Sequence, residues 1–411
     1  MAAHARHRGE RTSAEALARL RDGVLIAAFG VGLCLAGVPQ AKAQAVSPPA
    51  GQKPLIAKWL DGEAQANFPK ITYDGPPITL KYSSFVVAGT PLANLFIKSF
   101  KRLEEVSGGK LVVRPFWGST LSNAQRGAFE AIGGGIADFG NCYTIFNPGG
   151  FSLHHGLAIP FIFSTSGASS TVAQELYVKY LKPEYEAKNV YLLRVATTRP
   201  NKILSKVPVV KLEDVKGKKI WTPGVLQAQF GEALGGIPTN VQTSELYSAF
   251  QSGVVDLATM HDAGSRLFKL MEIAKNRNDV NLWINPTEYC VNKASFDKLP
   301  PDLKALFYHW AQLWNQVDAQ LYYDKEADEA LADMNKRGIV SVTMPPEQLA
   351  RWKAATQPVV DNWIKENEAK GAPAAKFIGD MKALADKYEK TPADEITQQL
   401  MDKPLPGIIV F

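Results

Sequence analysis

The sequence predicts a two-lobed α/β protein with a ligand-binding cleft between the lobes. The 411-residue chain is long enough for two domains, and its composition, 46% hydrophobic and 21% charged, is ordinary for a globular protein. Segments with the spacing of strands and of helices alternate along its first half, which favours an α/β fold. A short pattern also occurs twice, 118 positions apart, as Gly135 to Gly140 and as Gly253 to Ala258. The repetition indicates that both lobes contain the same helix–strand unit.

Each copy of this unit is an amphipathic segment followed by a glycine and a short apolar run. The amphipathic segments cover 121–132 and 244–250. Each ends near glycine because the end of a helix favours a left-handed backbone, which glycine adopts at low cost. The apolar run after the glycine is typical of a buried strand. A related unit in each lobe is consistent with a cleft between the lobes to which both lobes contribute residues.

The first 43 residues have the order of a secretory signal peptide. An arginine-bearing region precedes an apolar stretch over 24–38, and small residues then offer cleavage sites near Ala43 or Ala45. About 20 apolar residues are needed to span a bilayer, so this stretch is short for a membrane anchor, which is the alternative interpretation. Without this segment the net charge falls from +6 to +3, with no dense basic stripe, so the sequence gives no support to nucleic-acid binding. We expect a mature protein outside the cytoplasm, which the resemblance described below places in the periplasm.

The first lobe begins after a leader segment. Residues 44–77 are rich in proline, glycine and alanine and contain one short helical stretch around 56–65. Alternating polarity predicts a strand over 78–87, an apolar face predicts a helix around 92–103, and an apolar run predicts a strand over 111–115. Together with the first repeated unit, these alternations favour a mostly parallel sheet.

The chain crosses between the lobes more than once. A strand over 190–197 leaves the first lobe, a strand over 218–221 belongs to the second, and a return strand lies within 280–291. Paired crossings of this kind act as a hinge. Helical spacing continues over 300–337, and a last short strand follows at 339–344. We therefore divide the chain into a signal peptide at 1–43, a leader at 44–77, the first part of lobe I at 78–196, the first part of lobe II at 197–284, a return to lobe I at 285–300, a spanning helix with the completion of lobe II at 301–370, and a C-terminal extension at 371–411.

Two cysteines remain once the signal segment is removed. Cys142 and Cys290 each lie in an apolar, strand-like run. They could pair in an oxidising compartment, but we expect two buried free thiols. Two cysteines alone cannot hold a structural zinc ion, which takes four ligands. The sequence therefore predicts no metal site and no cofactor.

Catalytic motifs are absent from the sequence. It contains neither a Gly-x-Ser-x-Gly elbow nor a phosphate-binding Gly-x-x-x-x-Gly-Lys-Ser/Thr loop. His154 and His155 are adjacent, which is poor spacing for two metal ligands from one helix face. His261 and Asp262 could form an acid–base pair, although no nucleophile lies near them in the sequence. We expect a protein that is not an enzyme, and an exported enzyme that uses His261 and Asp262 is an alternative.

Several short phrases resemble one known family in their order and spacing. The stretch 199–224 (RPNKILSKVPVVKLEDVKGKKIWTPG) resembles the phrase P-I-x-x-x-x-D-L-K-G-x-K-I-R-x-P of the periplasmic solute-binding proteins of tripartite ATP-independent (TRAP) transporters, the DctP family. The matching residues are Pro208, Asp214, Lys216, Gly217, Lys219, Ile220 and Pro223. The turn at 107–110, the unit at 121–138 and the segment at 157–161 are similar to the family's T-G-G-K, G-x-I-D and L-P-F phrases. The resemblance runs from about 78 to 370.

The resemblance implies a fold and a function. The fold is that of a type II-like periplasmic binding protein, with lobes joined by hinge strands and a long C-terminal helix packed across both. The function is to capture a small organic acid, with an aromatic or apolar body, and to deliver it to the membrane subunits of a TRAP transporter. A binding protein of another importer class that takes a neutral solute is the alternative.

One departure from the family affects the predicted site. Members usually have an arginine in the K-I-R-x-P strand, where its planar fork binds a ligand carboxylate, whereas this chain has Trp221. The loss of one charge-assisted hydrogen bond costs roughly 1.5–3 kcal/mol unless another group replaces it. Arg199 lies near a position where some relatives have a second ligand-contacting arginine, so we take it as the substitute.

The same motifs give the remaining predicted ligand contacts, which are Tyr143, Thr243, Met260 and His261. Relatives often have charged, amide or aromatic residues at these positions. Together with Trp221, they predict a cleft that is more aromatic and less cationic than is usual in the family.

Overall fold

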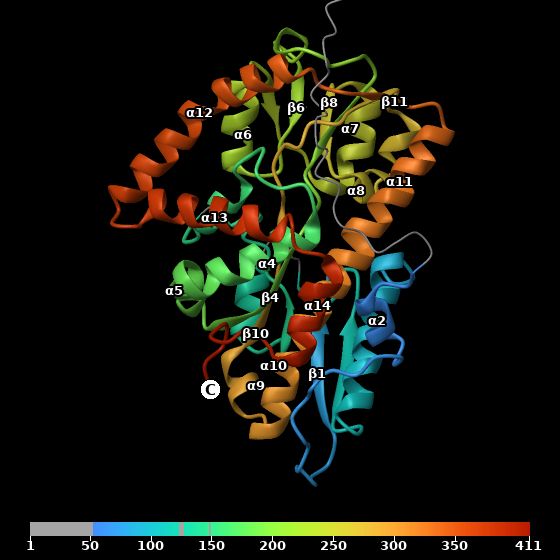
Figure 1. The fold of residues 1–411 in the computed structure, drawn as a ribbon, viewed down its shortest axis with the longest axis vertical. Coiled ribbons are helices and arrows are strands. Elements are labelled where there is room, and N and C mark those ends of the chain that lie inside the picture. Colours follow the sequence, from blue (N-terminus) through green and yellow to red (C-terminus); the bar gives the residue numbers. More distant parts are fainter. Residues whose placement is uncertain (1–51, 123–126, 148) are drawn as a thin grey trace, which may run out of the picture. The chain divides into compact units, whose positions relative to one another are not determined.

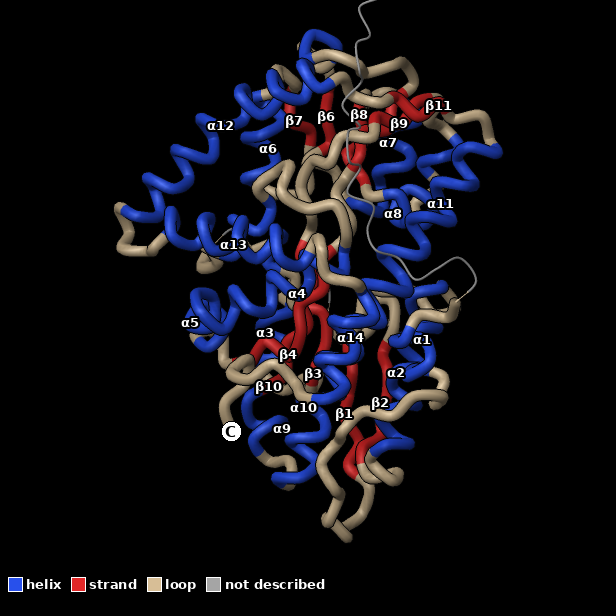
Figure 2. Tube along the Cα trace, in the orientation of Figure 1, coloured by secondary structure: helices blue, strands red, loops and turns tan. Residues whose placement is uncertain are grey.

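The computed structural model describes residues 52–122, 127–147 and 149–411. Residue contacts divide the chain into a unit at 1–42 and a unit at 43–411. The predicted signal peptide, the beginning of the leader and part of the first repeated helix therefore lie outside the described residues. Within the second unit, two β-sheets have helices on both faces (Figure 1). Figure 2 shows the strands of each sheet between these flanking helices.

The first sheet has the strand order β2-β1-β3-β10-β4. Its strands are β1 (Ile78–Ser83), β2 (Leu111–Phe116), β3 (Phe139–Asn141), β4 (Val190–Thr197) and β10 (Pro286–Asn292). β1 is parallel to β2 and β3, whereas β10 is antiparallel to β3 and β4. Four of the five strands therefore run in one direction, so the expectation of a mostly parallel sheet is confirmed except at β10. The reason is that β10 returns from the second lobe and so enters the sheet in the opposite direction.

The second sheet has the order β11-β9-β5-β8-β6-β7. Its strands are β5 (Lys202–Ser205), β6 (Lys219–Trp221), β7 (Ile237–Thr239), β8 (Leu257–Met260), β9 (Asn276–Asn278) and β11 (Val340–Val342). β6 is parallel to both β7 and β8. β5, the first strand after the crossing, is antiparallel to β8 and β9.

The predicted repeat is confirmed in both lobes. The order β2-β1-β3 in the first sheet corresponds to β7-β6-β8 in the second. The matching helices are α2 (Pro91–Val106) and α3 (Ala128–Gly133) in the first copy, and α6 (Val225–Ala233) and α7 (Leu246–Ser252) in the second. Gly135 and Gly253 both have a left-handed backbone, with φ of 77° and 79°. The glycines therefore end the two helices for the reason that the sequence indicated.

An aspartate–lysine contact is also repeated. The Asp138 carboxylate accepts a hydrogen bond from the backbone N–H of Lys81 at 2.7 Å, and Asp256 accepts one from Lys219 at 2.9 Å. Each lysine ammonium in turn donates to a backbone carbonyl near the glycine turn, that of Ile136 in the first copy and that of Gly253 in the second. Each contact fixes the turn before the third strand against the first strand of the unit.

A long helical segment packs on both lobes, as predicted. It consists of α10 (Pro301–Gln316), a π-helical segment η7 (Val317–Asp324) and α11 (Lys325–Lys336). α10 packs on β4 of the first sheet, and α11 packs on α8 (Asp262–Leu267) of the second lobe. Trp310 and Trp314 of α10 are fully buried, so the apolar face of this helix forms part of the first core.

The C-terminal helices return from the second lobe to the first. α12 (Pro346–Glu368) packs on α6, and α13 (Ala374–Tyr388) packs on α4 (Ser166–Leu176). Figure 1 shows α12 leading away from α6 and α13 leading back towards α4. α14 (Ala393–Asp402) packs on α10 and on α1 (Leu55–Leu60), which is the short helix of the leader.

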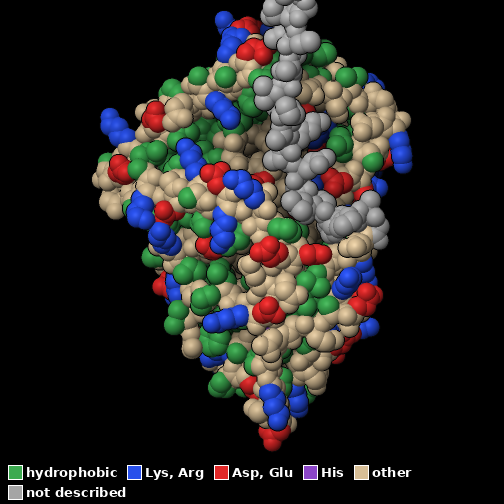
Figure 3. Space-filling view, in the orientation of Figure 1, with side chains coloured by type: hydrophobic (Ala, Val, Ile, Leu, Met, Phe, Trp, Pro, Cys, Tyr) green, Lys and Arg blue, Asp and Glu red, His purple; other side chains and the backbone are tan. Residues whose placement is uncertain are grey.

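The remaining helical elements are short. They are η1 (Thr144–Phe146), η2 (His154–Ala158), η3 (Tyr177–Leu181), α5 (Lys182–Glu186), η4 (Leu212–Asp214), η5 (Thr243–Glu245), η6 (Leu270–Glu272) and α9 (Lys293–Asp297). Among the described residues, no helix has the length and apolarity needed to cross a bilayer. On the face drawn in Figure 3, acidic and basic side chains are interspersed.

Candidate functional site

A pocket lies at the carboxyl end of β6, between loops that follow strands of the two sheets. Its volume is about 220 Å³, and the side chains that line it are uncharged. Ile145 and Phe146 reach it from η1, which follows β3 of the first sheet. The rest of the lining comes from the second lobe: Trp221, Pro223, Gly224, Val225, Asn240, Val241, Gln242 and Thr243. Ligands of α/β proteins characteristically bind outside the carboxyl ends of the strands.

Trp221 is the last residue of β6 and forms an aromatic wall of this pocket. Its side chain is 3% exposed, and its indole N–H donates to the carbonyl of Val241 at 3.1 Å. The carbonyl of Trp221 accepts a hydrogen bond from the Thr259 hydroxyl at 2.5 Å. Because its one N–H is already bonded within the protein, Trp221 can offer a ligand only the apolar surface of its ring.

Gly224 allows the two lobes to approach closely beside the pocket. A Cβ atom at this position would lie 3.0 Å from a side-chain carbon of Ile145 and 2.5 Å from the Gln227 amide oxygen. Helix α6 begins at Val225, and Gly224 at its N-cap gives it no side-chain cap. The first backbone N–H groups of a helix lack partners within the helix, and its N-terminus carries partial positive charge. The pocket therefore adjoins an end of a helix that suits an anion.

Tyr143 lies behind the pocket rather than in its lining. Its side chain is 6% exposed, and its ring stacks on that of Phe146 with 6.4 Å between the ring centres. Phe85, from the loop after β1, meets the same ring edge-on at 5.4 Å. Burial raises the pKa of Tyr143 well above its ordinary value, so its phenol stays protonated at neutral pH.

Met260 and His261 follow β8, the strand next to β6. Met260 is buried in the same apolar cluster as Trp221. His261 caps helix α8, where its Nδ1 accepts a hydrogen bond from the backbone N–H of Gly264 at 3.1 Å, and its ring lies edge-on to Tyr323 at 5.4 Å. Burial lowers the pKa of His261 to about 4. The ring is therefore neutral at pH 7, and the acceptor role of Nδ1 assigns its proton to Nε2.

Arg199 lies on the first crossing between the lobes and is bonded to two carboxylates. Its Nε donates to Asp324 at 2.9 Å and its Nη1 donates to Asp328 at 2.6 Å. Asp324 also accepts hydrogen bonds from the backbone N–H groups of Ser166 and Gly167, at the start of α4. Arg199 thus connects the crossing to the spanning helix and is not part of the pocket lining.

Of the six predicted ligand contacts, the structure brings Trp221 and Thr243 together in the pocket. Sequence reasoning did not identify Phe146, Gly224 or the loop at 240–242. Gly224 had a usable signal, because it stands between a predicted strand and a predicted helix, where glycine often permits close contact. Phe146 had none, since its place depends on how the lobes meet.

A buried carboxylate positions η1, the segment that carries Phe146. Glu288 of β10 accepts a hydrogen bond from the Thr144 hydroxyl at 2.5 Å. The same carboxylate lies 2.5 Å from Nε2 of His154, whose Nδ1 lies 3.1 Å from the Tyr185 hydroxyl. Each ring nitrogen of His154 therefore lies beside a polar group of the protein interior. No group of residues suited to a metal ion occurs in the described part of the chain.

Asp262 is likewise bonded within the protein. Its two oxygens accept hydrogen bonds from Nε and Nη2 of Arg277 at 2.6 and 2.7 Å. Both side chains are buried. This bidentate pair commits the Asp262 carboxylate to Arg277, so it is not oriented as the partner of His261 that an acid–base pair would require.

The expectation of two free thiols is wrong, because Cys142 and Cys290 form a disulfide. Cys290 lies opposite Gly140 where β10 pairs with β3, and Cys142 follows the last residue of β3. The two Cα atoms are 5.8 Å apart, within the usual range for a disulfide. The sequence did not reveal the bond because 148 positions separate the cysteines and their strands become neighbours only in the sheet.

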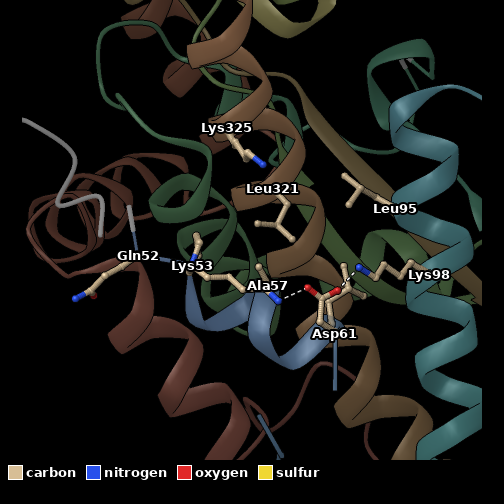
Figure 4. A pocket seen from close by; sticks show the side chains of 10 residues that line it. Gln52, Lys53, Ala57, Asp61, Leu95, Lys98, Leu321 and Lys325 are labelled. Atoms are coloured by element: carbon tan, nitrogen blue, oxygen red, sulfur yellow. Dashed lines mark hydrogen bonds and ion pairs between the residues drawn. The ribbon is translucent and has the colours of Figure 1, made fainter. Parts of the chain in front are cut away.

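A second pocket lies on the first lobe, between α1, α2 and the junction of η7 with α11 (Figure 4). Its volume is about 500 Å³, larger than that of the pocket at β6. Lys53 and Lys98 point to Asp61, which pairs with both. Its lining includes no strand end, and two of its three lysines are bonded to Asp61. We therefore place the candidate ligand site at β6.

Two repeated α/β lobes, joined by several crossings and enclosing an uncharged pocket at their strand ends, define an extracytoplasmic solute-binding protein. Residues 82–367 match the family described as bacterial extracellular solute-binding protein, family 7 (DctP), and the chain belongs to this family. Solved structures similar to this chain include proteins described as TRAP periplasmic solute-binding proteins.

Three similar proteins illustrate the relationship. The C4-dicarboxylate-binding periplasmic protein DctP of Rhodobacter capsulatus is 26% identical over 310 residues, which are 73% of this chain and 90% of the relative. A TRAP periplasmic solute-binding protein from Desulfovibrio salexigens has a TM-score of 0.69 and 26% identity, and the match covers 76% of this chain and 98% of that one. A TRAP solute-binding protein from an unidentified marine microbe, described as specific for aromatic acid ligands, has a TM-score of 0.71 and 23% identity, covering 77% and 100%.

Proposed function

We propose that this protein binds a small aromatic carboxylic acid in the periplasm and delivers it to the membrane subunits of a TRAP transporter. The observation that carries the proposal is the pocket between Trp221 and Phe146, which joins two aromatic side chains to the N-terminus of α6 and has no charged side chain in its lining. The solved relative that is described as specific for aromatic acids supports the same class of ligand.

The carboxylate would be bound without the arginine that is usual in the family. Backbone N–H groups at the start of α6 can receive it, and the charge of a helix N-terminus contributes about 0.3–2 kcal/mol to binding an anion. The body of the ligand would pack on Trp221, because aromatic contacts are worth about 0.5–1.5 kcal/mol beyond the area they bury. Micromolar affinity requires only about −8 kcal/mol, which these contacts and desolvation can supply. A second carboxylate has no matching cation here, so we propose a monoacid.

The predicted contacts take different roles in this proposal. Trp221 gives a flat wall and Thr243 a hydroxyl, both from the pocket lining. Tyr143 packs on Phe146 and Met260 lies in the apolar cluster of Trp221, so both support the aromatic side chains, and the neutral Nε2–H of His261 is a hydrogen-bond donor. Arg199 can bind a ligand oxygen only through donors that Asp324 and Asp328 do not already occupy.

Ligand binding would bring the lobes together about the crossings. A solute that contacts both Phe146 and Trp221 stabilises the state in which these residues are close, so its binding shifts the population towards that state. We propose the lobe boundaries given by the sequence, with lobe I beginning at 78 and the first crossing at 197. We also propose removal of the signal peptide near Ala43 or Ala45, and release of the solute unchanged, without catalysis.

The proposal is tested by identifying and then replacing the solute. Mass spectrometry of protein purified from its native host should detect a co-purified aromatic acid. Isothermal titration calorimetry should give a micromolar Kd for benzoate and much weaker binding of succinate. A neutral co-purified solute, with no binding of either acid, would contradict the proposal and favour the other importer class. Chemical conversion of a bound solute would favour the enzyme.

Trp221 provides matched variants for the same titrations. Trp221→Arg should gain affinity for succinate and lose affinity for benzoate, because it adds a cation and removes the aromatic wall. Trp221→Phe is the control that keeps an aromatic face, and it should retain benzoate binding within about tenfold, as expected for a loss of about 1.4 kcal/mol. Identical binding profiles for the two variants would show that Trp221 does not contact the ligand.

A further inference from the structure

A hydroxyl group lies among apolar side chains in the middle of the second sheet. Thr259 of β8 is completely buried. It lies opposite Ile203 of β5, and Leu257 stands two positions before it on β8, so the side chains of these residues project from the same face. Ile203 and Leu257 belong to one cluster of buried apolar residues. A hydroxyl in such surroundings needs a hydrogen-bond partner, because an unpaired buried polar group is costly.

The partner of this hydroxyl is the backbone at the end of the neighbouring strand. The Thr259 hydroxyl donates a hydrogen bond to the carbonyl of Trp221, the last residue of β6, at 2.5 Å. The pairing of β6 with β8 ends at Trp221, which lies opposite Ala258. The chain then leaves the sheet for α6 through Thr222 and Pro223. The side-chain bond therefore fixes the backbone at the point where β6 ends.

The Trp221 ring lies on the other face of the sheet. Trp221 belongs to a buried cluster that includes Ala258 and Met260 of β8. Thr259 lies between these two residues along the strand, and successive side chains of a strand point to opposite faces. Thr259 therefore reaches Trp221 through its backbone, from the face opposite to the ring.

A second hydrogen bond holds the ring itself. The indole N–H of Trp221 donates to the carbonyl of Val241, which belongs to the loop at 240–242 and lines the pocket together with Trp221. The backbone and the ring of Trp221 are thus fixed by separate bonds. A side chain held in this way presents one orientation to a solute, so binding does not have to order it.

We propose that Thr259 is a positioning residue of the solute site, whose hydroxyl holds the end of β6 so that the Trp221 ring forms the wall of the pocket. This role rests on the proposed function, in which the body of the solute packs on Trp221. Without the hydroxyl, the end of β6 can take other orientations, and a solute binds only those molecules in which the ring is in place. The apparent affinity falls in proportion to their fraction. A ring in place in about one molecule in ten weakens binding about tenfold, which corresponds to about 1.4 kcal/mol.

Three threonine variants test this role by calorimetry with benzoate. Thr259→Val removes the hydroxyl, keeps the branched shape and should raise the Kd about tenfold. Thr259→Ser keeps the hydroxyl, and its Kd should lie within about threefold of that of the wild type. Thr397→Val is the matched control, because Thr397 of α14 is also completely buried and its hydroxyl donates to the carbonyl of Ala393 at 3.0 Å. This control should leave the Kd unchanged.

A double-mutant cycle shows whether Thr259 acts through Trp221. Once Trp221→Ala has removed the ring, Thr259→Val should change the Kd by less than about twofold, because no wall remains to be positioned. Fluorine NMR of protein labelled with 5-fluorotryptophan gives a readout that needs no ligand. The Trp221 resonance is assigned by its absence from Trp221→Phe. It should be single in the wild type and in Thr259→Ser, and it should broaden or split in Thr259→Val.

These measurements distinguish the positioning role from the proposed function. Wild-type affinity in Thr259→Val, an equal loss in Thr397→Val, or a full effect of Thr259→Val on top of Trp221→Ala would overturn the role and leave aromatic-acid binding intact. Failure of the wild type to bind benzoate would overturn the proposed function. The Trp221 resonance then decides the role by itself, as it does if Trp221→Ala binds too weakly to measure, and an unchanged resonance in Thr259→Val overturns it. Thermal melts check folding, and Thr259→Ala, which removes the same hydroxyl, replaces Thr259→Val if that variant does not fold.

Discussion

The disulfide between Cys142 and Cys290 should contribute strongly to stability, because it closes a loop of 148 positions. Cross-linking lowers the entropy of the unfolded chain, and the chain-entropy relation gives about 5 kcal/mol at 25 °C for a loop of this length. Removal of native disulfides from other proteins typically costs about 2–5 kcal/mol. The double variant Cys142→Ala/Cys290→Ala should therefore lose several kcal/mol of unfolding free energy. Alanine is preferred to serine because both sites are fully buried, and a hydroxyl there would add the cost of an unpaired polar group.

Urea denaturation of the mature protein measures this effect, with circular dichroism as the probe. The midpoint for the wild type should fall when a reductant is added, whereas that of the double alanine variant should not change. Each single alanine variant should resemble the double variant, since either change removes the bond. If the wild type and the double variant unfold at the same urea concentration, or if the reductant has no effect on the wild type, the two cysteines are thiols in solution and the loop argument fails.

Two further predictions follow from buried contacts. The pKa of His261 is about 4 in the folded state, below its ordinary value of about 6.5. Between these two pH values the unfolded state binds more protons than the folded state. Stability therefore falls by up to about 3 kcal/mol as the pH drops through this window. Acid unfolding of His261→Gln should accordingly begin at lower pH than that of the wild type, and identical pH profiles would contradict the assigned burial. A Cβ at Gly156 would lie 2.5 Å from the Trp363 ring, so Gly156→Ala should lower the thermal midpoint through overpacking of about 1–3 kcal/mol. Gly379→Ala is the matched control, because Gly379 lies within helix α13 and no atom is near the position of an added Cβ. This variant should be more stable than the wild type by about 0.5–1 kcal/mol. If Gly156→Ala were the more stable of the two variants, the packing of η2 on α12 would be refuted.

Much of the fold could be predicted because its signals are local. The glycine that ends a helix, the apolar run of a buried strand and the sustained helical spacing of the spanning segment each depend on neighbouring residues. Gly135 and Gly253 illustrate this, since the backbone each adopts is the one that a helix end requires. The function was predicted from the order of the family phrases, because that order extends over most of the chain.

The candidate site was predicted in part. Trp221, a predicted ligand contact, lines the pocket at the end of β6, yet the bond from its indole N–H to Val241 could not be foreseen. The same holds for the two carboxylates that bind Arg199, which come from the spanning helix more than 120 positions away. Whether a side chain faces a ligand or an internal partner depends on which groups arrive beside it.

The sequence by itself determined the repeated units, the places where helices end and the family to which the chain belongs. Only the tertiary structure decided the mixed first sheet, the Cys142–Cys290 bond and the meeting of Phe146 with Trp221 at one pocket. The physical reason is the range of the interactions. Backbone preference and periodicity act over a few residues, whereas strand order and the approach of the lobes are set by the packing of the entire core.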